Sequence, residues 1–174
     1  MQAASKPKIE TVKEIGDGLH AKIYLAREIG NSNKLLCVKV FKREDETHQS
    51  LTDSRQQTEN EFRVSQIMKD HPNIIRVHSH ERDQVIRVDG KEETRDFLTL
   101  EYCENSDLFE FMAKYANRQN QQGATGSQGQ GMLVKDPLLL KALFLQLIEG
   151  IGAMHGKGQV AHMDIKLENV LISQ

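Results

Sequence analysis

The chain divides near residue 107 into two parts that differ in the spacing of their apolar residues, and this division limits the fold more than any other feature. Before it, apolar and polar residues mostly alternate, as in β-strands, with one helical stretch between them. After it, apolar residues recur every three or four positions, as in α-helices. The sequence therefore predicts an α+β fold with a sheet-rich first half and a helical second half.

The first half begins with a predicted three-stranded antiparallel meander. Residues 8–41 alternate as strands do, and Gly16-Asp17-Gly18 marks the first turn. The polar segment 42–57 indicates a loop or a fraying helix start. Thr58-Glu59-Asn60-Glu61 resembles a capping box, so we expect a helix to begin there and to stop at Pro72.

Two further strands complete the predicted sheet. Residues 84–88 and 97–102 alternate in polarity, and Asp89-Gly90 begins the connection between them. Five strands and one helix are therefore expected before the change in spacing.

The second half predicts two helices separated by a polar insert. One helix starts at Asp107, and residues 117–131 consist mostly of Asn, Gln, Gly and Ser, which predicts a flexible, dispensable segment. Asp136-Pro137 is a favourable start for a mostly buried helix over 138–154. Residues 160–172 then indicate a polar loop between two short strands.

Composition disfavours several classes of protein. The 174 residues carry 23 Lys and Arg against 25 Asp and Glu, so no excess of basic charge predicts nucleic-acid binding. Hydrophobic residues make up 38% of the chain, enough for a core, but the uninterrupted apolar runs are too short to predict a membrane span. The first residues lack a secretory signal and two cysteines make no disulfide framework, so we expect an intracellular, cytoplasmic protein.

The glycine pattern at Gly16 and Gly18 has two interpretations. It is either an ordinary hairpin turn or a flap that folds over phosphate groups. A dinucleotide-binding turn is disfavoured, because such a turn opens a helix and here a strand follows directly. Lys39 is likewise either a lysine whose stem packs on the sheet edge or a phosphate ligand, and Glu61 is the natural carboxylate to hold it.

The segment 162–169 places a carboxylate, an amine and an amide close together, on Asp164, Lys166 and Asn169. A solvated polar loop would carry the same residue types. Phosphoryl transfer can use all three: the carboxylate accepts or orients the attacking hydroxyl, the amine offsets charge on the transferring group, and the amide oxygen binds Mg²⁺.

Taken together, these motifs resemble the eukaryotic protein kinase family, and the resemblance covers the chain from about Lys8 to Ile172. The form of the last motif is similar to Ser/Thr kinases rather than Tyr kinases. Seven motifs stand in the order of the family: Gly16-x-Gly18-x-x-Ala21-x-Ile23, Cys37-Val38-Lys39, Glu61, His71-Pro72-Asn73-Ile74, Leu98-Thr99-Leu100-Glu101-Tyr102-Cys103, Asp107-Leu108-Phe109 and Asp164-Ile165-Lys166-x-x-Asn169.

The resemblance implies a two-lobed kinase fold that binds ATP and Mg²⁺ and phosphorylates Ser or Thr of protein substrates. Residues 1–7 would be a tail, about 8–104 the five-stranded first lobe with its helix and hinge, and about 105–174 the start of a helical second lobe. It implies catalytic roles for Asp164, Lys166, Asn169, Lys39 and Glu61, with Asn169 as the Mg²⁺ ligand. The implied nucleotide-binding residues are Ile15, Gly16, Gly18, Ile23, Cys37, Lys39, Leu100, Glu101, Cys103, Asp107 and Leu171.

Three departures from the family pattern affect the expected function. Ala21 stands at the third glycine, and Met163 replaces the usual Arg before Asp164, which removes the customary partner of an activation-loop phosphate. The 174 residues also contain no Asp-Phe-Gly, so we expect a fragment that is inactive alone and exposes an apolar helix face. The alternative is a pseudokinase-type scaffold that binds a nucleotide or a partner.

Overall fold

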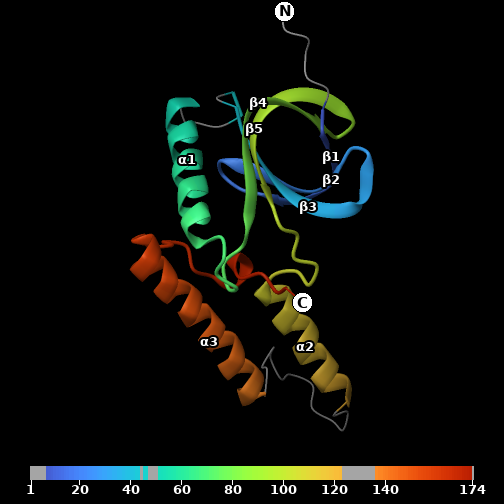
Figure 1. Ribbon diagram of the computed structural model, residues 1–174. Coiled ribbons are helices and arrows are strands. Elements are labelled where there is room, and N and C mark those ends of the chain that lie inside the picture. Colours follow the sequence, from blue (N-terminus) through green and yellow to red (C-terminus); the bar gives the residue numbers. More distant parts are fainter. Residues whose placement is uncertain (1–6, 44, 47–50, 123–135, 174) are drawn as a thin grey trace, which may run out of the picture. The chain divides into compact units, whose positions relative to one another are not determined.

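The computed structural model describes residues 7–43, 45–46, 51–122 and 136–173, which belong to two compact units. The first unit runs to Tyr102 and the second begins at Cys103. Figure 1 shows the sheet and α1 of the first unit, and the helices α2 and α3 of the second.

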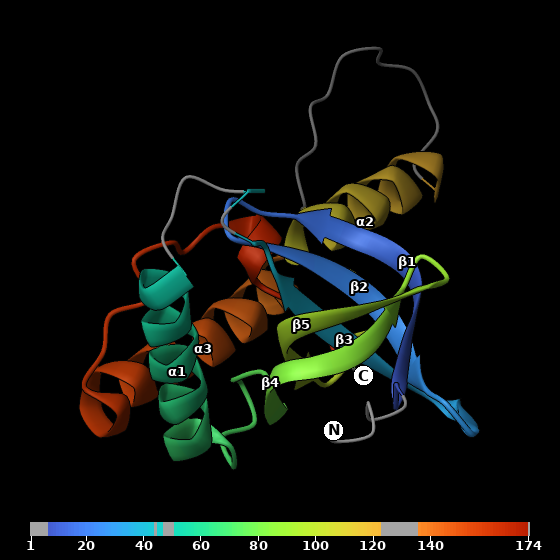
Figure 2. The same cartoon turned by 90° about the horizontal axis from the view of Figure 1, so that it is seen from above.

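The first unit has the five strands that the sequence predicts, and in the structure they close into a barrel. The strands follow the order β1-β2-β3-β5-β4, and all neighbours in this order are antiparallel. A short parallel pairing between β1 and β4, at Glu10 and Arg87, closes the barrel, which Figure 2 shows from above. The strands are β1 (Ile9–Asp17), β2 (Ala21–Glu28), β3 (Asn31–Phe41), β4 (Val77–Val88) and β5 (Lys91–Leu100).

Alternation along the strands produces two apolar clusters, one on each side of the sheet. The inner cluster fills the barrel with buried side chains: Ile9, Tyr24, Ala26, Leu36, Val38, Val40, Ile86, Val88 and Phe97. The outer cluster uses the intervening positions: Ala21, Cys37, Phe41, Val77, Leu98 and Leu100, with Ile23, Phe62 and Ile75 packed against it. Lys39, between Val38 and Val40, therefore projects from the outer face.

The predicted β4–β5 hairpin is confirmed, but β4 begins earlier than expected, and β5 runs over Lys91–Leu100 rather than over residues 97–102. Asp89 and Gly90 form its two-residue turn with φ of 48° and 79°, and positive φ at both positions matches the twist of an antiparallel pair. β4 begins at Val77 rather than Gln84, because a bulge between Glu81 and Gln84 lets the pairing continue despite the irregular polarity.

The helix of the first unit, α1 (Leu51–Met68), begins seven residues before the predicted start at Thr58. Thr58 is 2% exposed and lies inside the helix, so it is not the N-cap. The prediction failed because residues 51–57 show no clear apolar stripe. Figures 1 and 2 show α1 beside β4 and β5 on the outside of the barrel.

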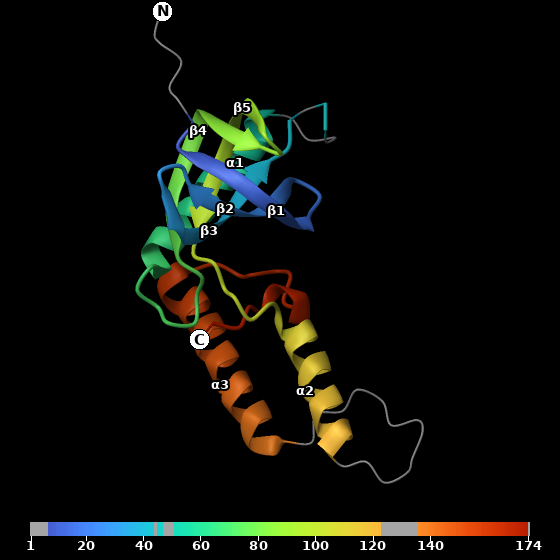
Figure 3. The same ribbon diagram turned by 90° about the vertical axis from the view of Figure 1, so that its right-hand side faces the viewer.

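The second unit contains α2 (Leu108–Gln122) and α3 (Pro137–Ala153), side by side in Figures 1 and 3. Asp136 caps α3 as predicted, since its carboxylate accepts hydrogen bonds from the backbone N–H groups of Leu138 and Leu139. The Tyr115 hydroxyl donates to Asp136 at 2.8 Å and so links α2 to the start of α3. A π-helical turn, η1 (Met154–Gly158), continues α3.

Three expectations for the second unit are corrected. α2 continues to Gln122, so residues 117–122 of the predicted insert are helical, while 123–131 lie outside the described residues. No strand flanks the polar loop in the described part of this unit. The loop contains a 3₁₀ turn, η2 (Leu167–Asn169), and a single bridge between Asp107 and Leu171.

The third correction concerns α3, which was expected to be mostly buried, although an exposed apolar helix face was also expected for the 174 residues alone and is what the structure shows. Among its residues only Gly150 is buried, and the exposed large side chains are Leu138, Leu140, Phe144, Leu145 and Ile148. The segment 137–158 is also long and apolar enough to cross a bilayer by length and composition. A single helix of this kind is weak evidence for a span, because core helices of soluble proteins meet the same criteria.

Candidate active site

The glycine-containing turn joins β1 to β2 and does not open a helix. The N–H of Gly18 donates to the carbonyl of Ala21 at 2.9 Å, and a Cβ added at Gly18 would lie 3.3 Å from that oxygen. A side chain at Gly18 would therefore crowd the turn. Ala21 is buried in the outer cluster, where its small side chain fits in place of the third glycine of the family pattern.

The backbone of this turn is braced by Asp17. Lys42 Nζ lies 2.7 Å from Asp17 Oδ1, and this hydrogen bond lowers the pKa of the Asp17 carboxyl. The N–H of Lys42 also donates to the carbonyl of His20 at 2.9 Å. Two contacts from the end of β3 thus hold a turn whose glycines would otherwise leave it loosely defined.

Lys39 and Glu61 form a bidentate ion pair between β3 and α1. The ammonium lies 2.8 Å from Oε1 and 2.7 Å from Oε2 of Glu61, and it stands 5.6 Å from the ring centroid of Phe41. The Lys39 side chain is 27% exposed, so the ammonium keeps access to solvent and to an anionic ligand. The structure thus brings together the two residues that the sequence suggested as partners.

Three of the residues implied for the adenine pocket share the outer face with Lys39. Ile23 lies opposite Lys39 in the β2–β3 pairing, and Cys37 lies opposite Leu100 in the β3–β5 pairing. Ile15 differs, because register shifts in β1 leave its side chain 47% exposed. An apolar surface thus continues from the Lys39–Glu61 pair along the same side of the sheet.

The implied hinge begins where β5 ends. The N–H of Glu101 donates to the carbonyl of Arg76 at 3.0 Å, and the Glu101 carboxylate accepts the N–H of Arg76 at 2.7 Å. The N–H of Glu101 is therefore engaged within the first unit, which leaves its carbonyl as the group that suits a nucleotide base. Cys103 begins the second unit and is partly buried.

In the second unit Asp164, Lys166 and Asn169 converge. Asp164 Oδ2 accepts a hydrogen bond from Asn169 Nδ2 at 2.8 Å and lies 3.2 Å from Lys166 Nζ. These contacts, that of Lys166 first, lower the pKa of the Asp164 carboxyl, so it is ionised at neutral pH. Asn169 Nδ2 also donates to the carbonyl of Asp164, which ties the two residues together twice.

Asp107 and Leu171 fix the end of the loop that carries Asp164, Lys166 and Asn169. The Asp107 carboxylate accepts the N–H of Glu110 at 2.8 Å and so caps α2, a structural role that the nucleotide-binding expectation did not include. Asp107 also pairs with Leu171, and the N–H of Leu108 donates to the carbonyl of Val170 at 2.7 Å. The end of the polar loop is thus fixed against the start of α2.

Two features of the site were missed from the sequence. Met163 has a φ of 64°, which is rare for a residue with a side chain, and it sets the direction in which the chain enters Asp164. Nothing in the residue type signals this conformation. The second is Arg55 of α1, which lies six residues before Glu61 and forms ion pairs with Asp83 and Asp96. Its sequence signal, an arginine in a polar stretch, is not specific.

The donor groups suit a nucleotide and a magnesium ion. Lys39 offers an ammonium held by a carboxylate, and the glycine turn offers backbone that approaches closely. Asn169 uses its amide nitrogen in both of its bonds to Asp164, which leaves its oxygen for Mg²⁺. Within the described ranges no group of three or more His, Cys, Asp or Glu could hold a metal ion.

The chain is similar to known proteins over most of its length. The family model described as "Protein kinase domain" matches residues 9–174. The chain is 26% identical to the mouse "Serine/threonine-protein kinase Nek5" over 94% of its length, which is 20% of that relative. It is 27% identical to "CBL-interacting serine/threonine-protein kinase 17" of Arabidopsis thaliana over 95% of the chain and 31% of the relative.

A third relative is "CBL-interacting protein kinase 26" of Oryza sativa subsp. japonica, 27% identical over 96% of the chain and 27% of the relative. The chain therefore spans less than a third of the length of these curated relatives. The family model covers nearly the whole chain, and the five-stranded sheet with its helix matches the fold expected from the motifs. The chain belongs to the protein kinase family.

Proposed function

We propose that this chain carries the nucleotide-binding sheet and the catalytic loop of a Ser/Thr protein kinase. The observation that carries the proposal is the convergence of Lys166 and Asn169 on the Asp164 carboxylate. Bound ATP would supply the phosphoryl group, and Mg²⁺ would neutralise part of the phosphate charge. Ser and Thr are proposed as acceptors because the relatives above are named serine/threonine kinases.

Lys39 and Glu61 would bind and orient the phosphates. Glu61 holds the ammonium through both carboxylate oxygens, so the long lysine side chain loses little further rotamer freedom when a phosphate binds beside it. The glycine turn would place backbone N–H groups over the same phosphates. The outer face at Ile23, Cys37 and Leu100 supplies an apolar surface for the base.

Asp164 would accept the hydrogen bond of the attacking hydroxyl. Lys166 and Asn169 both contact Oδ2, so we assign Oδ1 to the Ser or Thr hydroxyl. The lowered pKa of Asp164 keeps the carboxylate in its ionised form, and an ionised oxygen can accept the hydrogen bond of the hydroxyl. Lys166 Nζ would offset charge on the transferring group, and the Asn169 amide oxygen would bind Mg²⁺.

A scaffold that binds nucleotide without catalysis is the second candidate. Met163 stands in place of the usual arginine, and the described residues supply few metal ligands. Asp164, Lys166 and Asn169 argue for catalysis instead, because a pure scaffold has no chemical need for this convergence.

The test is phosphoryl transfer by the full-length protein, with γ-labelled ATP, Mg²⁺ and peptides that differ only in carrying Ser, Thr or Tyr. We expect Ser and Thr to be labelled. Asp164→Asn should lower the transfer rate by about 10²–10⁴-fold and leave ATP affinity nearly unchanged, since the carboxylate acts on the hydroxyl and not on the nucleotide.

The matched control is Arg27→Met, which removes an ion pair with Glu10 on β1 and β2 and should leave transfer unchanged. ATP binding without transfer by the unmodified protein would favour the scaffold. Near-normal transfer by the Asp164→Asn protein would refute the role given to Asp164.

A further inference from the structure

Helix α1 is attached to the sheet differently at its two ends. Toward the C-terminal end, Met68 is 1% exposed and Phe62 packs against the outer cluster, so this end is held by apolar contacts. The Gln66 side chain adds a hydrogen bond to the carbonyl of Val77 at 3.1 Å. The described side chains of α1 before Phe62 are those of residues 55–61, which are all polar or charged, and Thr58 is the buried one among them.

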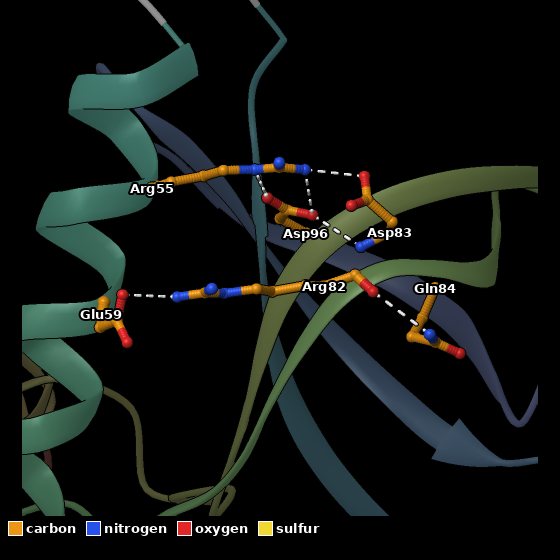
Figure 4. Close-up of polar contacts among 6 residues, drawn as sticks. All are labelled: Arg55, Glu59, Arg82, Asp83, Gln84 and Asp96. Carbon is orange, nitrogen blue, oxygen red and sulfur yellow. Dashed lines mark hydrogen bonds and ion pairs between the residues drawn. The ribbon is translucent and has the colours of Figure 1, made fainter.

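From Arg55 to Glu59, α1 makes charged contacts with the sheet, which Figure 4 shows. Arg55 Nε donates to Asp96 Oδ2 at 2.8 Å, and Arg55 Nη2 donates to Asp83 Oδ1 at 2.7 Å. Asp83 in turn donates its backbone N–H to Asp96 Oδ1 at 2.7 Å. One helix residue thus clamps both β4 and β5, and Glu59 adds a pair with Arg82 at 2.6 Å.

The contacts of Arg55 with Asp83 and Asp96, called the Arg55 clamp, form a stronger attachment than the Glu59–Arg82 pair. Asp96 is only 11% exposed, so its pairing with Arg55 is less screened than a surface ion pair. The guanidinium also engages Asp96 through two nitrogens, and hydrogen bonds between charged groups are about twice as strong as neutral ones. The Glu59–Arg82 pair is about half exposed on both sides and contributes little.

The contacts of Arg55 with Asp83 and Asp96 and the Lys39–Glu61 pair are two separate links between α1 and the sheet. Glu61 lies six residues after Arg55, about 9 Å along the helix axis. On the sheet, Asp96 lies two residues before Leu98, and Leu98 is the β5 partner of Lys39. A helix of this length moves as a unit, so the position of Glu61 depends on whether Arg55 is bound to Asp83 and Asp96.

We propose that Arg55 is a positioning residue that sets the distance between Glu61 and Lys39 by clamping the N-terminal part of α1 to Asp83 and Asp96. Its effect on catalysis rests on the function proposed above, in which Lys39 binds phosphate. Opening the clamp lets the N-terminal part of α1 move outward while the buried Met68 holds the C-terminal end, and Glu61, which lies between Arg55 and Met68, is drawn away from the ammonium.

The test measures Lys39 directly and does not require activity. The 174-residue chain is treated briefly with an N-hydroxysuccinimide acetate ester, and acetylation of Lys39 is quantified by mass spectrometry relative to the exposed Lys91. The Lys39 amine must leave both Glu61 oxygens before it can attack the ester. Glu61→Gln should therefore raise the Lys39 acetylation rate several-fold and defines the fully released state.

Arg55→Met should raise Lys39 acetylation toward the level of Glu61→Gln and should add nothing when Glu61 is already Gln. Asp96→Asn keeps the shape of the side chain and provides a second variant if Arg55→Met does not fold. Arg27→Met, which removes the Arg27–Glu10 pair on β1 and β2, is the control and should leave Lys39 unchanged.

Unchanged Lys39 acetylation in folded Arg55→Met would overturn the proposal. So would an equal increase with and without Glu61, because general loosening of the sheet would act in both backgrounds. ATP titration of the unmodified chain is a separate measurement. Failure to bind ATP would count against the proposed function and would leave the result for Arg55 and Lys39 as it stands.

Discussion

The two units present their reactive groups in different ways. In the first unit, Lys39 and Glu61 are 22 residues apart in the sequence and lie on a strand and a helix. The strand runs between two buried apolar clusters, one on each side of the sheet. In the second, Asp164 and Asn169 are five residues apart, and every side chain from 161 to 169 is exposed. The first geometry depends on packing of distant segments, whereas the second depends on local hydrogen bonds.

This difference predicts which substitutions should disturb each site. A substitution in the barrel should disturb the Lys39–Glu61 pair through the sheet, because strand register fixes which residues share a face. The Asp164 loop should respond mainly to changes in its own backbone and in the residues that cap it. The three predictions below test this contrast.

The largest effect is expected in the barrel core. Ile86 is fully buried in the inner cluster, so Ile86→Ala should lower the free energy of unfolding by about 3 kcal/mol. Phe144→Ala removes a larger side chain from α3, but that side chain is 64% exposed, and the change should stay within about 0.5 kcal/mol. Urea unfolding followed by circular dichroism measures both.

A cost for Phe144→Ala as large as that for Ile86→Ala would contradict the contrast, since it would mean that the α3 face is covered in solution. Repeating the measurement at two protein concentrations would then show whether a second copy of the chain covers it.

An intermediate effect is expected from Glu46, which joins the chain after β3 to β5. The hydrogen bond from Arg95 is the main reason that the pKa of Glu46 falls to about 2. Because the pKa is lower in the folded state, the stabilisation is complete above the unfolded pKa, near 4.5, and is lost as the pH falls through about 2. The Glu46 side chain is 40% exposed, so screening leaves about 1 kcal/mol.

Glu46→Gln should therefore lower the free energy of unfolding at neutral pH. It should also reduce the fall of that free energy between pH 4.5 and 2. Urea midpoints measured across this range test the prediction. Glu59→Gln breaks a pair that is exposed on both sides and serves as the control. An unchanged pH profile for Glu46→Gln would show that the Arg95 contact does not stabilise the first unit.

Sequence patterns predicted the parts of the fold that rest on apolar periodicity. The meander, the Asp89–Gly90 hairpin and the Asp136 cap are confirmed, because alternation, turn residues and capping residues act locally. The start of α1 was predicted wrongly, since ion pairs of Arg55 with β4 and β5 hold that part of the helix. Such contacts between distant segments leave no periodic signal.

The candidate site shows the same division. The pairing of Lys39 with Glu61 and the grouping of Asp164, Lys166 and Asn169 were suggested by residue types in a recognisable order. The exposure of Ile15 was not predicted, because bulges in β1 shift its register. The left-handed backbone of Met163 was not predicted either, because methionine has no preference for it.

The smallest effect is expected at Met163, whose φ of 64° places it in a region that costs a residue with a Cβ about 1–2 kcal/mol. Met163→Gly should relieve this strain, and since the side chain is 90% exposed, little packing is lost. Glycine also adds freedom to the unfolded chain, so the net gain should be about 0.5 kcal/mol.

Because the effect is local, the measurement is hydrogen exchange of the backbone N–H of Asn169, which donates to the carbonyl of Lys166 at 3.0 Å. We expect protection of this amide to rise about twofold in Met163→Gly. Met163→Ala keeps the Cβ and therefore the strain, so it should show no gain. Equal protection in the two variants would mean that the backbone at Met163 is unstrained, and the local hydrogen bonds alone would then determine the position of Asp164.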